Sequence, residues 1–138
     1  MRMKAAIIVC GMLCLCIAGA IVLEVRRHDV SVREEAKSVG LTWHVLYVTR
    51  DAIRAAQEAT GRAPPLTIGE LLSFIQGYSG QVQEPMWDMN VGTISDGWGQ
   101  PILIVTDGAR VVGLASKGPN GRWDGGHGDD ILVELSSK

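Results

Sequence analysis

The sequence predicts an α+β fold with a long N-terminal helix, a short second helix and a small antiparallel sheet of about three strands. Three observations support this prediction. An apolar run leads into a helical pattern that lasts to Thr60, a capped helix follows, and three Ile- and Val-rich segments lie towards the C-terminus. With 138 residues, the chain has enough length for one hydrophobic core but not for two.

The first element is predicted to be a membrane anchor. The segment Ala5–Leu23 holds 19 consecutive residues without a charged side chain. A helix of that length spans about 28 Å, which is close to the thickness of the hydrocarbon core of a bilayer. Arg2 and Lys4 precede the segment, and this placement favours a cytoplasmic N-terminus and export of the rest of the chain.

We therefore expect an anchor over residues 1–28 and an exported domain over residues 29–138. A cleaved signal peptide is the alternative, because Ala18-Gly19-Ala20 has the small-x-small form that signal peptidase accepts. Either interpretation places the domain beyond the membrane.

The charge of the exported part argues against a nucleic-acid partner. From Glu24 onward, 11 basic side chains face 15 acidic ones, and they form no basic cluster. Proteins that bind nucleic acids use Lys and Arg patches to contact phosphates.

Two helices are expected in the exported domain. The first covers Val30–Lys37, bends at Gly40 and continues over Leu41–Thr60, and Gly61 caps it. Its apolar face comprises Trp43, Leu46, Ile53 and Ala56. The second helix begins at a capping box, Thr67–Glu70, and ends near Gly77. Residues 78–100 are predicted to be an irregular connection that Met86, Trp87 and Trp98 pin to the core.

Three strands complete the prediction. Pro101–Val105 and Arg110–Ala115 form a hairpin, with Asp107-Gly108 as its turn, and Ile131–Leu135 closes the chain. Between the last two strands lies a segment with five glycines and three aspartates, which we call the acidic loop (residues 116–130).

The composition of the acidic loop suits calcium, which takes oxygen ligands from carboxylates, amides and backbone carbonyls. Side-chain oxygens come from Asn120, Asp124, Asp129 and Asp130. A solvated turn without a metal is the alternative interpretation. No nucleophile motif or paired carboxylate of catalytic type is present, so we do not expect an enzyme.

Four segments, in order, resemble the type II secretion pseudopilins, in particular the major pseudopilin family. Thr60–Pro65 is similar to the T-G-x-Y-P that ends the family's helix, and Asp96–Pro101 is similar to its D-P-W-G-N-P. Leu114–Gly121 resembles the start of the family's calcium loop, and Gly128–Ile131 resembles its end. The resemblance covers nearly the whole chain and implies a pilin-like fold.

The resemblance also implies a calcium site in the acidic loop. Its ligands would come from the loop start, the loop interior and the loop end: Leu114, Ser116, Asn120, Asp124, Asp129 and Asp130. Asn120 stands where the family usually has an aspartate. An ion there would tie the second and third strands together.

By the same resemblance, the chain is a single-pass inner-membrane protein, held through residues 5–23, with a periplasmic C-terminal domain. It would be a structural component or accessory of a type II secretion or type IV pilus-like machine, in contact with further copies, other pseudopilins or machine subunits. The family's G-F-T-L-x-E is missing, and Cys16 stands where its glutamate would be. The alternative is therefore a monomeric calcium- or ligand-binding module, anchored or secreted, that does not polymerise.

Overall fold

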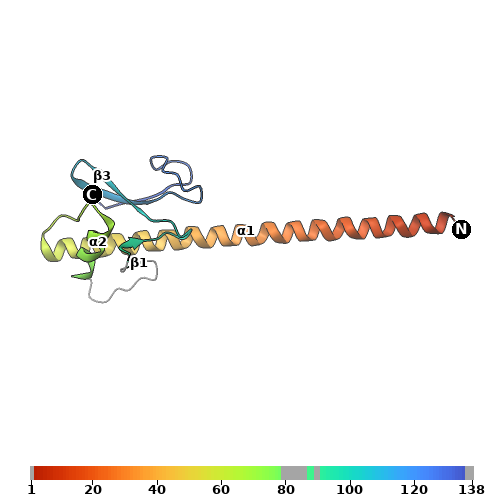
Figure 1. The fold of residues 1–138 in the computed structure, drawn as a ribbon, viewed down its shortest axis with the longest axis horizontal. Coiled ribbons are helices and arrows are strands. Elements are labelled where there is room, and N and C mark those ends of the chain that lie inside the picture. The colour runs from red at the N-terminus through yellow and green to blue at the C-terminus, as the bar shows by residue number, and fades with distance from the viewer. Residues whose placement is uncertain (1, 79–86, 89–90, 136–138) are drawn as a thin grey trace. The chain divides into compact units, whose positions relative to one another are not determined.

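The first element of the chain is one long helix. α1 spans Arg2–Thr60 and continues through Gly40, so the predicted anchor and the amphipathic segment after it belong to the same helix (Figure 1). Gly61 ends the helix as predicted. Its φ is 67°, and its N–H donates to the carbonyl of Gln57 at 2.7 Å.

The computed structural model describes residues 2–78, 87–88 and 91–135, with side chains from residue 19 onward. It divides into two units, Met1–Ala36 and Lys37–Lys138. The described residues of the first unit are all helical, and the second unit holds the end of α1, a second helix and two small sheets. The predicted α+β class is therefore confirmed.

The predicted membrane segment, residues 5–23, lies mostly outside the described side chains. Among the residues that are described, no helix combines the length and the apolar character needed to cross a bilayer.

α2 covers Ile68–Gln76 and begins at the predicted capping box. The Thr67 hydroxyl accepts the backbone N–H of Glu70 and donates to the Glu70 carboxylate at 2.8 Å. The helix buries one face, made of Leu71, Leu72 and Ile75. Capping thus sets where the helix starts, and burial of this face stabilises it.

The larger sheet is antiparallel, with strand order β3-β4-β5. β3 covers Leu103–Asp107, β4 covers Arg110–Ser116 and β5 covers Ile131–Glu134. The predicted hairpin is present, but its turn is Gly108-Ala109 and not Asp107-Gly108, because Asp107 still pairs with Arg110. Gly108 has a φ of 60°. The predicted third strand also pairs with the second, so the two ends of the acidic loop lie side by side.

The prediction of an irregular connection over residues 78–100 was wrong in part. β1, Trp87–Asp88, pairs with β2, Thr93–Ile94, in a two-stranded antiparallel sheet. The turn between them is closed by the Gly92 N–H, which donates to the Asp88 carbonyl at 2.8 Å. Strands of two residues are too short to give the alternating pattern that identifies a strand in a sequence.

The core lies between the end of α1, α2 and the sheets. Its fully buried large side chains are Val45, Leu46, Ile53, Leu71, Leu72, Ile75, Ile94 and Leu114. Trp43, which we predicted on the apolar face of the helix, is 38% exposed and stacks on Tyr47 instead. Two threonines, Thr42 and Thr49, take core-facing positions of α1 where a purely apolar pattern would not place them.

Of the three residues expected to pin the connection, two are described and both pack on the core. Trp87 is buried and donates from Nε1 to the Thr49 hydroxyl at 3.1 Å. Trp98 is partly buried against the same core. Met86 lies outside the described residues. The hydrogen bond to Trp87 explains the buried threonine, because each side chain satisfies the other.

Candidate functional site

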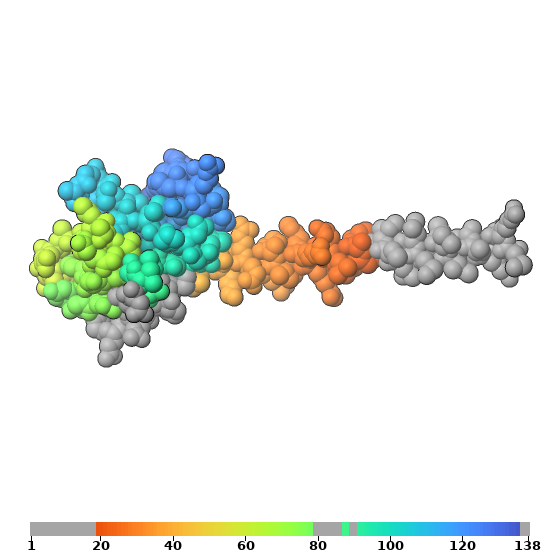
Figure 2. All heavy atoms as spheres, in the orientation of Figure 1, coloured from red at the N-terminus to blue at the C-terminus, as the bar shows by residue number. Residues whose placement is uncertain are grey.

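The acidic loop connects β4 to β5 and forms a lobe on the surface of the second unit, drawn in blue in Figure 2. All five of its glycines have a positive φ. Only glycine adopts that backbone conformation without strain, so the glycine content reflects the path of the loop.

Asn120, Asp124 and Asp129 are brought together within this loop. The side-chain amide of Asn120 donates to Asp129 Oδ1 at 2.6 Å and to Asp124 Oδ2 at 3.5 Å. The backbone N–H of Asn120 donates to Asp129 Oδ2 at 3.2 Å. One residue thus engages both oxygens of the Asp129 carboxylate.

Asp130 closes the second half of the loop. Its Oδ2 accepts the backbone N–H of Asp124 at 2.7 Å and that of Gly126 at 3.0 Å. Its Oδ1 is buried and has no hydrogen-bond partner. A buried carboxylate oxygen without a donor is costly, and it is the kind of atom that a cation would satisfy.

The two predicted ligands at the loop start are placed differently. Leu114 lies in the middle of β4, paired with Ile104 and Val133, and its side chain is in the core. Ser116 is the last residue of β4 and is fully buried. Its hydroxyl donates to Asp96 Oδ2 at 2.6 Å and accepts the Gly118 N–H at 3.1 Å. The Leu114 side chain therefore belongs to the core, and the Ser116 hydroxyl is engaged by Asp96 and Gly118.

Asp96 is the centre of a hydrogen-bond network that sequence reasoning did not find. Its carboxylate is fully buried, and Oδ1 accepts the backbone N–H groups of Trp98 at 2.9 Å and Gln100 at 2.8 Å. Gln100 in turn donates from Nε2 to the Gly118 carbonyl at 3.0 Å. The segment Asp96–Pro101 and the start of the acidic loop are therefore joined in space.

The same segment contacts α1. The Gly97 N–H donates to the Thr42 hydroxyl at 2.8 Å, and that hydroxyl donates to the Ser38 carbonyl at 2.8 Å. A Cβ on Gly97 would lie 2.0 Å from the Ser38 carbonyl oxygen. Gly97 is therefore a point of close backbone approach between the segment Asp96–Pro101 and α1. The only sequence evidence for this arrangement is the Asp-Gly-Trp-Gly pattern itself.

The chemistry of the loop suits calcium, but its hydrogen bonds already occupy most of the donor oxygens. Both Asp129 oxygens and Asp130 Oδ2 accept N–H groups, which leaves Asp130 Oδ1 as the buried oxygen without a donor. Within the described part of the chain, no three or more His, Cys, Asp and Glu side chains are grouped in a way that could hold a metal ion. A bound ion would therefore require some of these contacts to change.

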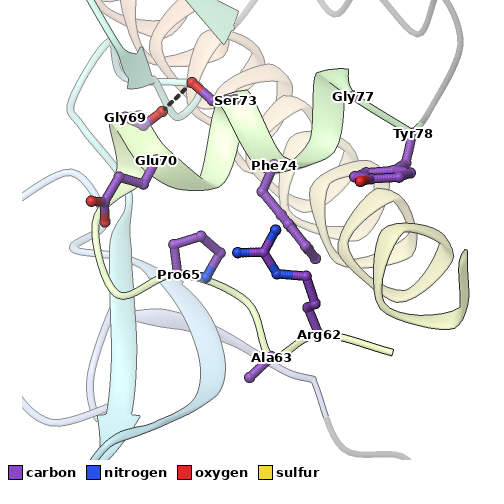
Figure 3. A pocket seen from close by; sticks show the side chains of 9 residues that line it. All are labelled: Arg62, Ala63, Pro65, Gly69, Glu70, Ser73, Phe74, Gly77 and Tyr78. Carbon is purple, nitrogen blue, oxygen red and sulfur yellow. Dashed lines mark hydrogen bonds between the residues drawn. The ribbon is translucent and has the colours of Figure 1, made fainter. Parts of the chain in front are cut away.

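A second feature is an open cleft of about 820 Å³ between α2 and the segment that follows α1. It is lined by Arg62, Ala63, Pro65, Gly69, Glu70, Ser73, Phe74, Gly77 and Tyr78. Figure 3 shows the Arg62 guanidinium lying between Pro65 and Phe74. The Glu70 carboxylate lies at the first turn of α2. The cleft therefore combines aromatic and apolar surface with one cationic group, Arg62, and one anionic group, Glu70.

Comparison with known proteins gave no match. No protein-family model, curated protein sequence or solved structure matches this chain.

Proposed function

We propose that this protein is a membrane-anchored, pseudopilin-like structural component or accessory of a type II secretion or type IV pilus-like machine. In this proposal residues 5–23 cross the inner membrane and the second unit lies in the periplasm. Partners are further copies of the chain, other pseudopilins or subunits of the machine, and no nucleic acid or catalytic step is involved.

The observation that carries the proposal is the course of α1. One helix includes the apolar segment near the N-terminus and also supplies the core of the α+β unit, where Leu46 and Ile53 are fully buried. In this proposal the same helix would run from the membrane segment into the folded domain. The four sequence segments that resemble pseudopilins add to this, since two of them are joined through Asp96 and Ser116.

α1 also carries apolar side chains that are exposed to solvent. Val25 and Val32 follow the predicted membrane segment, are 62% and 49% exposed, and lie seven residues apart and therefore on one face of α1. Apolar side chains exposed together on one face are typical of a surface that binds another protein. A neighbouring helix in an assembly would cover them.

Calcium is the proposed stabilising ligand of the exported domain. The residues that would hold it are Asp130, through its free Oδ1, together with Asp124, Asp129 and the amide oxygen of Asn120. When bound, the ion supplies positive charge among three carboxylates, and it stabilises the folded domain because it binds only that form.

Photo-crosslinking in membranes tests the structural role. We would place a photoreactive amino acid at Val32 in the full chain, and at exposed Ala109 on the hairpin as the matched control. We expect Val32 to crosslink to a second copy or another membrane protein and Ala109 to give much less product. A phosphatase fused after Lys138 should be active in the periplasm. An inactive fusion, or crosslinks at neither position, would contradict the proposal.

The second candidate is a monomeric calcium- or ligand-binding module that does not polymerise. The cleft beside α2 favours it, because aromatic residues next to a guanidinium suit a ligand with an apolar body and an acidic group. In that case the chain remains a monomer in the crosslinking experiment, and Arg62→Ala together with Phe74→Ala abolishes ligand binding without affecting the acidic loop.

A further inference from the structure

The acidic loop contains a neutral amide between two carboxylates. Asn120 Nδ2 donates to Asp129 Oδ1 at 2.6 Å and to Asp124 Oδ2 at 3.5 Å. The orientation of this amide is fixed by its other end, since Asn120 Oδ1 accepts the backbone N–H of Arg122. Exchanging the oxygen and nitrogen would turn an acceptor towards Asp129 and a donor towards an N–H, so the network permits one orientation.

Two carboxylates close to one another repel unless a positive charge or hydrogen-bond donors lie between them. In this loop the donors belong to Asn120, whose backbone N–H also reaches Asp129 Oδ2. Asn120 is thus the residue through which the first half of the loop is tied to Asp129, close to the start of β5.

We propose that the Asn120 amide takes the place of a cation in the acidic loop, so that it closes the loop without metal and sets how strongly the loop depends on calcium. This inference deepens the proposed function and rests on its calcium-binding part. The amide and the ion are alternatives, because calcium would need the Asp129 oxygens that now accept Asn120 N–H groups. The Asn120 amide would also have to turn its oxygen towards the ion.

The test is Asn120→Asp in the full chain purified in detergent. This substitution keeps the shape and the oxygen that accepts the Arg122 N–H, and it replaces the Nδ2 donor with the second oxygen of a fourth carboxylate in the loop. Gln76→Glu is the matched control, since Gln76 is exposed at the end of α2 and gains the same charge away from the loop. Tm is measured by tryptophan fluorescence in chelator, in millimolar calcium and in millimolar magnesium.

In chelator we expect Asn120→Asp to lower Tm by about 5 °C or more, and Gln76→Glu to lower it much less. In calcium we expect the Tm of Asn120→Asp to rise towards that of the wild type, with a rise at least twice that of the wild type and of Gln76→Glu. Magnesium should not reproduce the rise, because it prefers a smaller and more rigid octahedral site.

The inference would be overturned if Asn120→Asp melted in chelator like Gln76→Glu, because the amide would then not be closing the loop. If Asn120→Asp lost stability in chelator but calcium raised Tm in neither protein, exchange between amide and ion would be excluded. The calcium part of the proposed function would fail with it, whereas the crosslinking at Val32 would still decide the structural role.

Discussion

The hydroxyl of Ser116 donates to the carboxylate of Asp96 at 2.6 Å, and both side chains are fully buried. This hydrogen bond joins the end of β4, where the acidic loop starts, to the segment that leads into β3. The Asp96 carboxylate also accepts two backbone N–H groups. Its negative charge is therefore buried among donors, which is the condition under which a charged group is tolerated in a core.

Removing the hydroxyl should destabilise the domain. Ser116→Ala leaves Asp96 Oδ2 without a donor and the Gly118 N–H without its acceptor, and we expect a loss of about 1–3 kcal/mol in the free energy of unfolding. Ser73→Ala is the matched control, because Ser73 is exposed and its hydroxyl bonds only within α2. The measurement is denaturant unfolding of the full chain in detergent. Equal stability of the two variants would show that the buried bond contributes nothing.

Gly97 should tolerate no side chain. Gly97→Ala places a Cβ 2.0 Å from the Ser38 carbonyl oxygen, which belongs to the backbone of α1 and cannot move aside. We expect a loss of about 2–4 kcal/mol, in the range of severe overpacking. Gly40→Ala is the control, since Gly40 lies in α1 near Ser38 and its Cβ would meet no atom within 4 Å.

Gly40→Ala should instead raise stability by up to about 1 kcal/mol through helix propensity. Thermal melting of both variants by circular dichroism checks the pair. Similar melting temperatures for Gly97→Ala and Gly40→Ala would contradict the close approach at Gly97.

Much of the fold could be predicted because its elements are specified locally. The capping box at Thr67, the glycine after Thr60 and the Asp-Gly near the hairpin turn act over a few residues, so a sequence reveals them. The two-residue strands β1 and β2 could not be found, since pairing between distant residues decides them. Trp43 is exposed whereas Thr42 and Thr49 are buried, which is the reverse of what a hydrophobic pattern predicts.

The site was predictable in composition but not in its connections. The sequence analysis identified Asn120, Asp124, Asp129 and Asp130 as oxygen donors in one loop, and the structure places them within that loop. It also assigned Ser116 to the ligand set, whereas this side chain bonds to Asp96. Side-chain hydrogen bonds between residues 20 positions apart leave no periodic or local pattern, so sequence alone did not indicate the partner of Asp96.

An alanine substitution in the acidic loop should destabilise the domain more at Gly118 than at Gly128. Gly118 has a φ of 63°, and a Cβ there would lie 2.3 Å from the Asp129 carbonyl oxygen. Gly128 has a φ of 69° with no atom within 4 Å of its Cβ. We expect Gly128→Ala to cost about 1–2 kcal/mol from backbone strain alone.

Gly118→Ala should cost clearly more than that, because strain and a backbone clash add. The free energies of unfolding of the two variants, measured side by side, decide this prediction. Equal losses would mean that the loop can move away from Asp129 at no cost.

Asp130 provides the most direct test of calcium binding. Asp130→Asn keeps one oxygen to accept the Asp124 and Gly126 N–H groups and removes the charge at the buried Oδ1 position. Since calcium strongly prefers carboxylate ligands at such a site, we expect any calcium-induced rise in Tm to be lost, while Tm in chelator changes by no more than about 3 °C.

Asp107→Asn is the control, because Asp107 is exposed near the hairpin turn and far along the chain from the loop end. It should leave the calcium response unchanged. A calcium response that survived Asp130→Asn at full size would place the ion elsewhere and remove Asp130 from the proposed ligand set.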